Sequence, residues 1–178
     1  MMIQNRRAAW LWFLVAAIVG LVADLGSKSA VFSWLGYPSE EIAVIVPGWL
    51  QLVTRLNNGG IWSIGAEYGL QMNSLLIIFC GSASVLILIW AYFGIRPGER
   101  IFPLVLGGIL AGAMGNLHDR IIHQGVRDFI EFHYFDVWYY PTFNLADSFL
   151  VCGATYLVLS SVLGLDGRST TSPALSST

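Results

Sequence analysis

The chain has 178 residues, of which 56% are hydrophobic and only 11% are charged, and its formal net charge is −2. Its mean hydropathy of +0.66 excludes an ordinary soluble domain. The near-zero net charge excludes a basic surface for nucleic acid.

Four long apolar runs predict membrane-spanning helices at residues 8–28, 70–95, 101–121 and 143–165. The first run follows Arg6 and Arg7 and could be the core of a cleavable signal peptide, but the three later runs favour a permanent anchor. We interpret residues 1–165 as one integral membrane domain and the Ser- and Thr-rich residues 166–178 as a flexible tail.

The lengths of the connections predict the topology. A short polar turn at residues 96–100 joins the second and third runs, whereas long segments join the first to the second and the third to the fourth. With four spans, both termini and the short turn share one side, and both long segments lie on the other. The terminal side carries Arg6, Arg7, Arg96, Arg100 and Arg168. The positive-inside rule therefore predicts that this side is cytoplasmic.

The first long segment predicts a small sheet within residues 38–66. Residues 42–46 and 49–56 are rich in β-branched and apolar side chains, and Pro47-Gly48 and the 57–60 turn bound them. We therefore expect an all-α membrane protein, a bundle of four transmembrane helices with a small extracytoplasmic β-element between helices 1 and 2.

Polar residues gather at the outward ends of three predicted helices, at residues 24–28, 115–120 and 143–147. An ionisable side chain at the centre of a membrane helix costs about 2.5 to 3.5 kcal/mol, so each calls for a partner or a function. Asp24 and Lys28 are four residues apart, which predicts a structural ion pair. We expect Asp119 to orient its neighbour Arg120 or to close the helix end.

Two acids could form a reactive pair at this outer face. Asp147 lies in the fourth span, three residues after Asn144, and Asp128 lies in the second long segment, which can fold back over the same place. Two carboxylates in a partly desolvated site share a proton, so one can serve as acid and the other as base. Such a pair can activate water to cut a peptide bond without a metal or a covalent nucleophile. The pattern does not assign the shared proton.

Five motifs in order resemble those of lipoprotein signal peptidase, also called signal peptidase II, a family of bacterial membrane aspartyl peptidases. They are the motifs at residues 24–28, 57–63, 115–120, 126–130 and 143–148. The chain departs from the usual family pattern in having Gly60 and Ile61 where alanines are usual, and Ala111 before Gly112 where two glycines are frequent.

The resemblance implies both the site and the reaction. The family removes the signal peptide of a prolipoprotein by cleaving before a cysteine that carries a diacylglyceryl group. The catalytic residues implied are Asp128 and Asp147, and the residues that line or support the substrate site are Asn57, Gly59, Asn116, Arg120 and Asn144. We expect no cofactor and no metal, membrane lipid as a partner, and a monomer in the bacterial inner membrane with its active site at the extracytoplasmic face.

Two other classes of function stay open at this point. Intramembrane acids and bases also build the relays of small transporters and proton channels. Such a relay needs polar residues at several depths, whereas residues 75–95 and the inner halves of the other spans carry no charge. The second alternative is a non-catalytic scaffold or assembly factor, in which the acids would serve packing or partner contacts.

Overall fold

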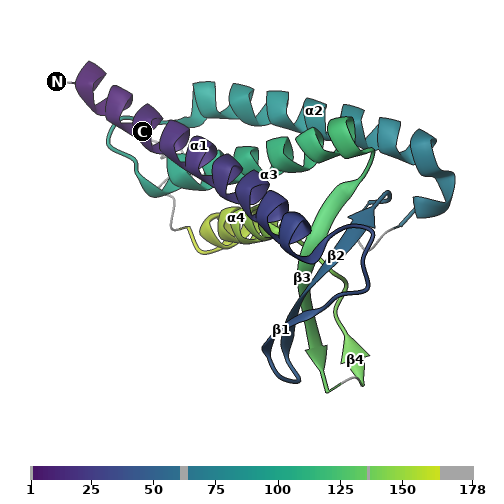
Figure 1. Cartoon of the computed structure of the whole chain (residues 1–178). Helices are drawn as coiled ribbons and strands as arrows, with labels where there is room; N and C mark the ends of the chain where they lie inside the picture. Colours follow the sequence, from purple (N-terminus) through teal and green to yellow (C-terminus); the bar gives the residue numbers. More distant parts are fainter. Residues whose placement is uncertain (1, 61–63, 136, 165–178) are drawn as a thin grey trace, which may run out of the picture.

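The computed structural model describes residues 2–60, 64–135 and 137–164. Four long helices pack together, and an antiparallel sheet projects from one end of them (Figure 1). The helices are α1 (Met2–Leu35), α2 (Gly69–Gly94), α3 (Ile101–His123) and α4 (Leu145–Val162). Each is long and apolar enough to cross a membrane. The predicted class, a bundle of four spanning helices with a small sheet, is confirmed.

Helix α3 is the centre of the bundle, because it packs against α1, α2 and α4. Small residues permit this close packing. A Cβ atom on Gly112 would collide with the carbonyl oxygen of Ala146 on α4. A Cβ atom on Gly20 of α1 would lie only 2.8 Å from the Cβ of Ala111. Gly20 therefore provides the space for Ala111.

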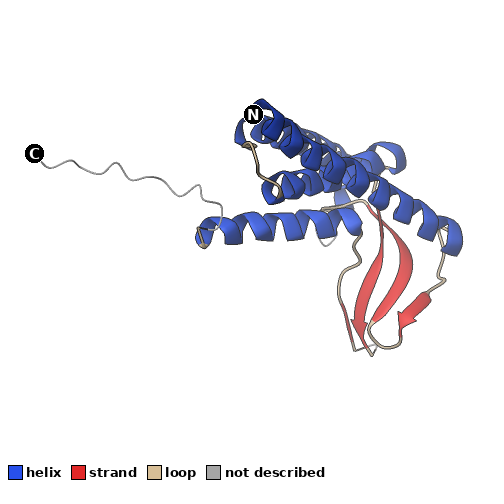
Figure 2. Cartoon of the chain, turned by 90° about the vertical axis from the view of Figure 1, so that its left-hand side faces the viewer, coloured by secondary structure: helices blue, strands red, loops and turns tan. Residues whose placement is uncertain are grey.

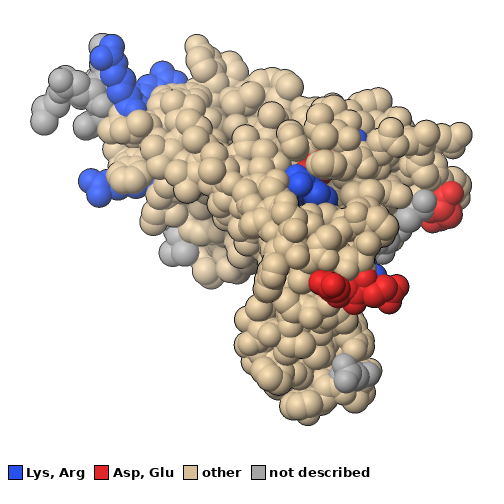
Figure 3. All heavy atoms as spheres, viewed as in Figure 1, with Lys and Arg blue, Asp and Glu red and all other residues tan. Residues whose placement is uncertain are grey.

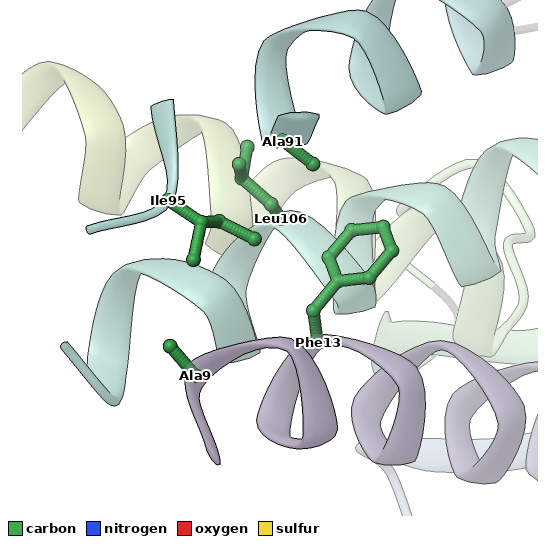
Figure 4. Close-up of a cluster of buried hydrophobic side chains, with 5 residues drawn as sticks. All are labelled: Ala9, Phe13, Ala91, Ile95 and Leu106. Atoms are coloured by element: carbon green, nitrogen blue, oxygen red, sulfur yellow. The ribbon is translucent and has the colours of Figure 1, made fainter. Parts of the chain in front are cut away.

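The first turns of α1, the end of α4 and the turn between α2 and α3 lie at one end of the bundle, as the parity of the spans predicts (Figure 1). A hydrophobic cluster closes the bundle at this end (Figure 4). Its buried members are Ala9, Phe13, Ala91, Ile95 and Leu106. Burial of each large apolar side chain contributes about 1.5 to 3 kcal/mol in water, and in lipid close packing replaces much of that term.

The sheet has four strands in the order β1-β2-β3-β4 and extends away from the helices (Figure 2). Strands β1 (Ala43–Val46) and β2 (Leu50–Asn57) lie within one residue of their predicted positions. Strands β3 (Val126–Tyr134) and β4 (Trp138–Tyr139) come from the second long segment. The sheet therefore extends beyond the predicted β-element at residues 38–66, because two of its strands come from the second long segment.

The reason is the antiparallel pairing of β3 with β2, in which Ile130 lies opposite Leu52 and Asp128 lies opposite Arg55. The pairing joins the two long segments to each other on one side of the bundle. At its base, Val31 and Leu35 of α1 pack against Phe129 of β3. This contact accounts for the extension of α1 beyond the predicted residue 28.

Candidate active site

The first turn of α4 holds Asp147 in a fixed orientation. The side-chain oxygen of Asn144 accepts the backbone N–H of Asp147 at 3.0 Å, and Oδ2 of Asp147 accepts the backbone N–H of Asn144 at 3.2 Å. These reciprocal hydrogen bonds form a capping box at the start of the helix. The local sequence therefore fixes the direction of this carboxylate before any tertiary contact is considered.

Asp128 lies on β3, and its side chain is buried, with only 2% of the residue exposed. Nδ2 of Asn144 donates to Oδ1 of Asp128 at 2.6 Å, and Nδ2 of Asn57 donates to Oδ2 at 3.2 Å. Asn57 reaches Asp128 because β2 and β3 are paired. The sheet thus places this carboxylate beside the beginning of α4.

Asn116 of α3 joins the group from a third element. Its Nδ2 donates to Oδ1 of Asp147 at 2.8 Å, and its Oδ1 accepts from Nδ2 of Asn144 at 3.3 Å. Asn144 consequently contacts both acids, Asp128 through its amide nitrogen and Asp147 through its amide oxygen and backbone. The structure brings together the two predicted carboxylates and three predicted asparagines.

Burial, together with the nearby charge of Asp147, raises the pKa of Asp128 from its ordinary value to about 7. Hydrogen bonds from Asn144 and Asn57 oppose this shift only in part. Within the described part of the chain, no lysine or arginine forms an ion pair with either carboxylate. A carboxyl group at position 128 can therefore retain its proton near neutral pH.

A second cluster of charged side chains is balanced, because each of its acids has a basic partner. Lys28 Nζ lies 2.8 Å from Asp24 Oδ2 and 3.4 Å from Asp119 Oδ2, and Arg127 Nη2 lies 2.8 Å from Asp119 Oδ1. The Asp24–Lys28 ion pair is present as predicted, but it is fully buried. Asp119 does not orient Arg120; it binds Arg127 and Lys28. Adjacent residues on a helix do not face each other, which explains why the first of the two roles expected for Asp119 was wrong. For the second role, closing the helix end, Asp119 Oδ2 accepts the backbone N–H of Arg127 just beyond α3 at 3.0 Å.

The charged cluster is linked to the acid pair through Asn116. Lys28 Nζ donates to Oδ1 of Asn116 at 3.1 Å, which turns the Nδ2 of the same amide toward Asp147. Asp24 Oδ1 accepts the backbone N–H of Ala146 in α4 at 2.9 Å. The cluster thus supports both the amide that contacts Asp147 and the helix that carries it.

Arg120 supports the turn that carries Asn57 and contacts neither acid. Its Nη2 donates to the carbonyl oxygen of Gly59 and its Nη1 to that of Asn116, both at 3.3 Å. Oδ1 of Asn57 accepts the N–H of Gly59 at 3.0 Å, which closes the turn. Residues 61–63 of this motif lie outside the described residues.

Two further residues were not among the predicted site residues. Asn73 of α2 is 5% exposed, and its Nδ2 donates to the carbonyl oxygen of Arg120 at 3.1 Å. Arg127 holds Asp119 beside the strand that carries Asp128. A lone asparagine in an otherwise apolar span was the available signal for Asn73, because such amides seek partners on neighbouring helices. For Arg127 the signal was its position directly before Asp128.

A groove of about 720 Å³ opens beside Asn57, on the sheet and the segment that follows β4. Its lining includes Tyr37, Arg55, Asn57, Glu131 and Tyr140. Its volume lies within the range of about 300 to 1,000 Å³ that is usual for ligand pockets, and its lining residues lie outside the spanning helices. Within the described residues, no group of three His, Cys, Asp or Glu side chains is placed to hold a metal ion.

Comparison with known proteins decides the family. The family model described as Signal peptidase (SPase) II matches residues 16–163. The chain belongs to the signal peptidase II family. A lipoprotein signal peptidase of Cellvibrio japonicus is 35% identical, over 92% of this chain and 93% of that protein. Another, from Rhodopirellula baltica, is 34% identical, over 84% of this chain and 70% of that protein.

Solved structures agree with the fold of this signal peptidase II family member. A bacterial membrane enzyme determined at 2.3 Å resolution superposes with a TM-score of 0.74 and 20% identity, over 88% of this chain and 90% of that one. A second, at 1.9 Å resolution, gives a TM-score of 0.71. The chain is thus a multi-pass membrane peptidase, and the transporter and scaffold hypotheses lose their support.

Proposed function

We propose that the chain removes the signal peptide from diacylglyceryl-modified prolipoproteins by cleaving before the lipid-modified cysteine. The family match and the names of the relatives, lipoprotein signal peptidases, support this reaction. We place the protein in the bacterial inner membrane, with its termini in the cytoplasm and its site at the extracytoplasmic face. The arginines at the terminal end and the position of the acids at the opposite end support that orientation. We propose that the protein acts as a monomer.

Asp128 and Asp147 are the proposed catalytic pair, and the observation that carries this proposal is the shared Asn144. Asp128 is the acid, because burial and the neighbouring charge raise its pKa to about 7. Asp147 is the base. It accepts an amide N–H from Asn116 and a backbone N–H at the start of α4, both of which orient its oxygens.

The reaction then proceeds by two proton exchanges. Asp147 takes a proton from water as the water oxygen attacks the scissile carbonyl carbon, and Asp128 gives its proton to the carbonyl oxygen. In the second step Asp128 recovers a proton from the tetrahedral diol, and Asp147 protonates the amide nitrogen as the carbon–nitrogen bond breaks. The enzyme ends in its starting state, with Asp128 protonated and Asp147 ionised.

The asparagines and Arg120 position this pair and the substrate. Asn57 and Asn144 hold Asp128, Asn116 holds Asp147, and Arg120 fixes the turn at Gly59. We place the residues that follow the cleaved bond in the groove beside Asn57, because that groove lies outside the membrane spans. Holding the peptide against a fixed acid pair supplies the positioning part of the rate enhancement.

The proposed substrate class is tested with the purified full chain and two precursors of identical sequence. One carries the diacylglyceryl group on its cysteine and the other does not. We expect release of the signal peptide from the modified precursor alone, followed by gel shift and by mass spectrometry of the new amino terminus. A precursor with serine in place of the cysteine is the matched control. Equal cleavage of both precursors would show that lipid is not recognised, and cleavage of neither would contradict the proposed function.

A further inference from the structure

A second groove lies at the opposite end of the molecule from the candidate active site. Its volume is about 630 Å³, within the range of about 300 to 1,000 Å³ that is usual for ligand pockets. It runs between the first turns of α1 and the end of α2. Its lining includes Arg6, Arg7, Trp10, Leu11, Leu14 and Tyr92.

One end of this groove is positively charged. Arg6 Nη2 donates to the carbonyl oxygen of Tyr92 at 2.9 Å, which holds the guanidinium at the groove edge and leaves its other N–H groups available. Arg7 is exposed beside it. In the part of the chain that the structure describes, neither arginine forms an ion pair with an acid. Several basic side chains lie at this end of the molecule and others lie near its middle, whereas the acids in view lie away from this end (Figure 3).

The rest of the groove is apolar. One face of α1 carries, at helical spacing, the charged Arg7 followed by the apolar Leu11 and Leu14. These three residues cover roughly 10 Å of the helix surface. Leu11 is 61% exposed and Leu14 is 48% exposed. Trp10 packs on the hydrophobic cluster that closes this end of the bundle, which gives the groove a firm floor.

We propose that this groove binds one anionic phospholipid, with its phosphate at Arg6 and Arg7 and an acyl chain along Leu11 and Leu14. The order of charge and apolar surface along the groove is that of the lipid itself, from headgroup to chain. Basic pockets between spanning helices are known to suit acidic headgroups. A zwitterionic lipid lacks the net charge that the two arginines complement, and free phosphate lacks the chain. The proposal is independent of the proposed peptidase reaction.

Titration of the delipidated full chain in detergent with phosphatidylglycerol tests the site, with bound lipid counted by native mass spectrometry. Each arginine near a headgroup contributes about 1 kcal/mol, so the double variant Arg6→Gln, Arg7→Gln should bind about 30-fold more weakly. Arg100→Gln, at the same end but outside the groove lining, should bind within about twofold of the parent chain. Because the titration is done in detergent, without a bilayer, the substitutions cannot change the result by altering the orientation of the protein in a membrane.

The apolar half is tested separately with Leu11→Ala, Leu14→Ala, which keeps both arginines. This variant should also lose affinity for phosphatidylglycerol, and inorganic phosphate should not displace the bound lipid. Thermal unfolding of each variant in detergent checks that the fold is retained. Equal losses in Arg100→Gln and the double arginine variant would overturn the proposal, because diffuse charge would then explain the binding. Equal affinity for phosphatidylcholine, or displacement by phosphate, would overturn it as well.

Discussion

Two groups of acids lie side by side at the sheet end of the bundle, and they are held in opposite ways. Asp24 and Asp119 face Lys28 and Arg127, so each negative charge has a positive partner. The pair formed by residues 128 and 147 is held by asparagine amides and a backbone N–H. Amides orient a carboxylate without adding a positive charge. The comparison teaches that acids with positively charged partners stabilise the structure around the site. An acid pair without such partners can retain and exchange a proton.

The largest expected effect separates chemistry from folding. Asp147→Asn and Asp128→Asn each remove one member of the proton exchange, so cleavage of a diacylglyceryl-modified precursor should fall by about 10³-fold or more. Both variants should remain folded, since neither acid is part of the balanced cluster. Initial rates of signal-peptide release and the thermal unfolding midpoint are the two measurements. Near-normal cleavage by either variant would remove that residue from the catalytic pair.

The balanced cluster should respond in the opposite way. Asp119→Asn leaves Arg127 without its charged partner in a buried position, and breaking such a pair costs about 3 to 5 kcal/mol. We expect a large fall in the unfolding midpoint in detergent, whereas the exposed Glu41→Gln should change it little. An Asp119→Asn protein of normal stability but no activity would contradict the assignment of a structural role to Asp119.

A smaller expected effect is a pH dependence of folding stability that comes from Asp128. The folded-state pKa of Asp128 is about 7, above its ordinary value of 3.8, so this group destabilises the fold progressively as pH rises between those values. Asp128→Asn removes this dependence. The stability of the variant relative to the parent chain should therefore increase by up to about 3 kcal/mol from pH 5 to pH 8.

The measurement is the difference between the two unfolding midpoints at each pH, in which the titration of groups that do not interact with residue 128 cancels. Asn at position 128 has one acceptor oxygen for the two donors Asn57 and Asn144, so one hydrogen bond is lost at every pH. That loss shifts the difference by a constant. A difference that does not vary with pH would show that Asp128 titrates as an ordinary acid.

Sequence alone predicted much of this architecture for physical reasons that can be stated. Apolar runs long enough to cross a membrane define the four helices, and span parity places both long segments on one side. Turn residues and β-branched residues indicated β1 and β2. The strand β3 was missed because its aromatic residues also suit a membrane interface, and its pairing with β2 joins residues about 80 positions apart.

For the site as well, contacts within one helix could be predicted from the sequence, whereas contacts between elements could not. Helical spacing predicted the Asp24–Lys28 pair, because residues four apart lie on one face. Spacing could not predict that Asp119 binds Arg127, since that contact depends on where β3 meets the end of α3. The motifs named Asn57, Asn116 and Asn144 as members of the site. Which amide faces which carboxylate follows only from the three-dimensional contacts.

The capping box at the start of α4 also sets the order of events during biosynthesis. The hydrogen bonds that begin this helix are the ones that orient Asp147 and place Asn144 against Asp128. Among the described helices, α4 follows the other three in sequence, so a ribosome-bound chain with only α1, α2 and α3 inserted lacks both Asn144 and Asp147. Under the proposed mechanism, the newly made protein cannot cut a neighbouring precursor until α4 has entered the bilayer.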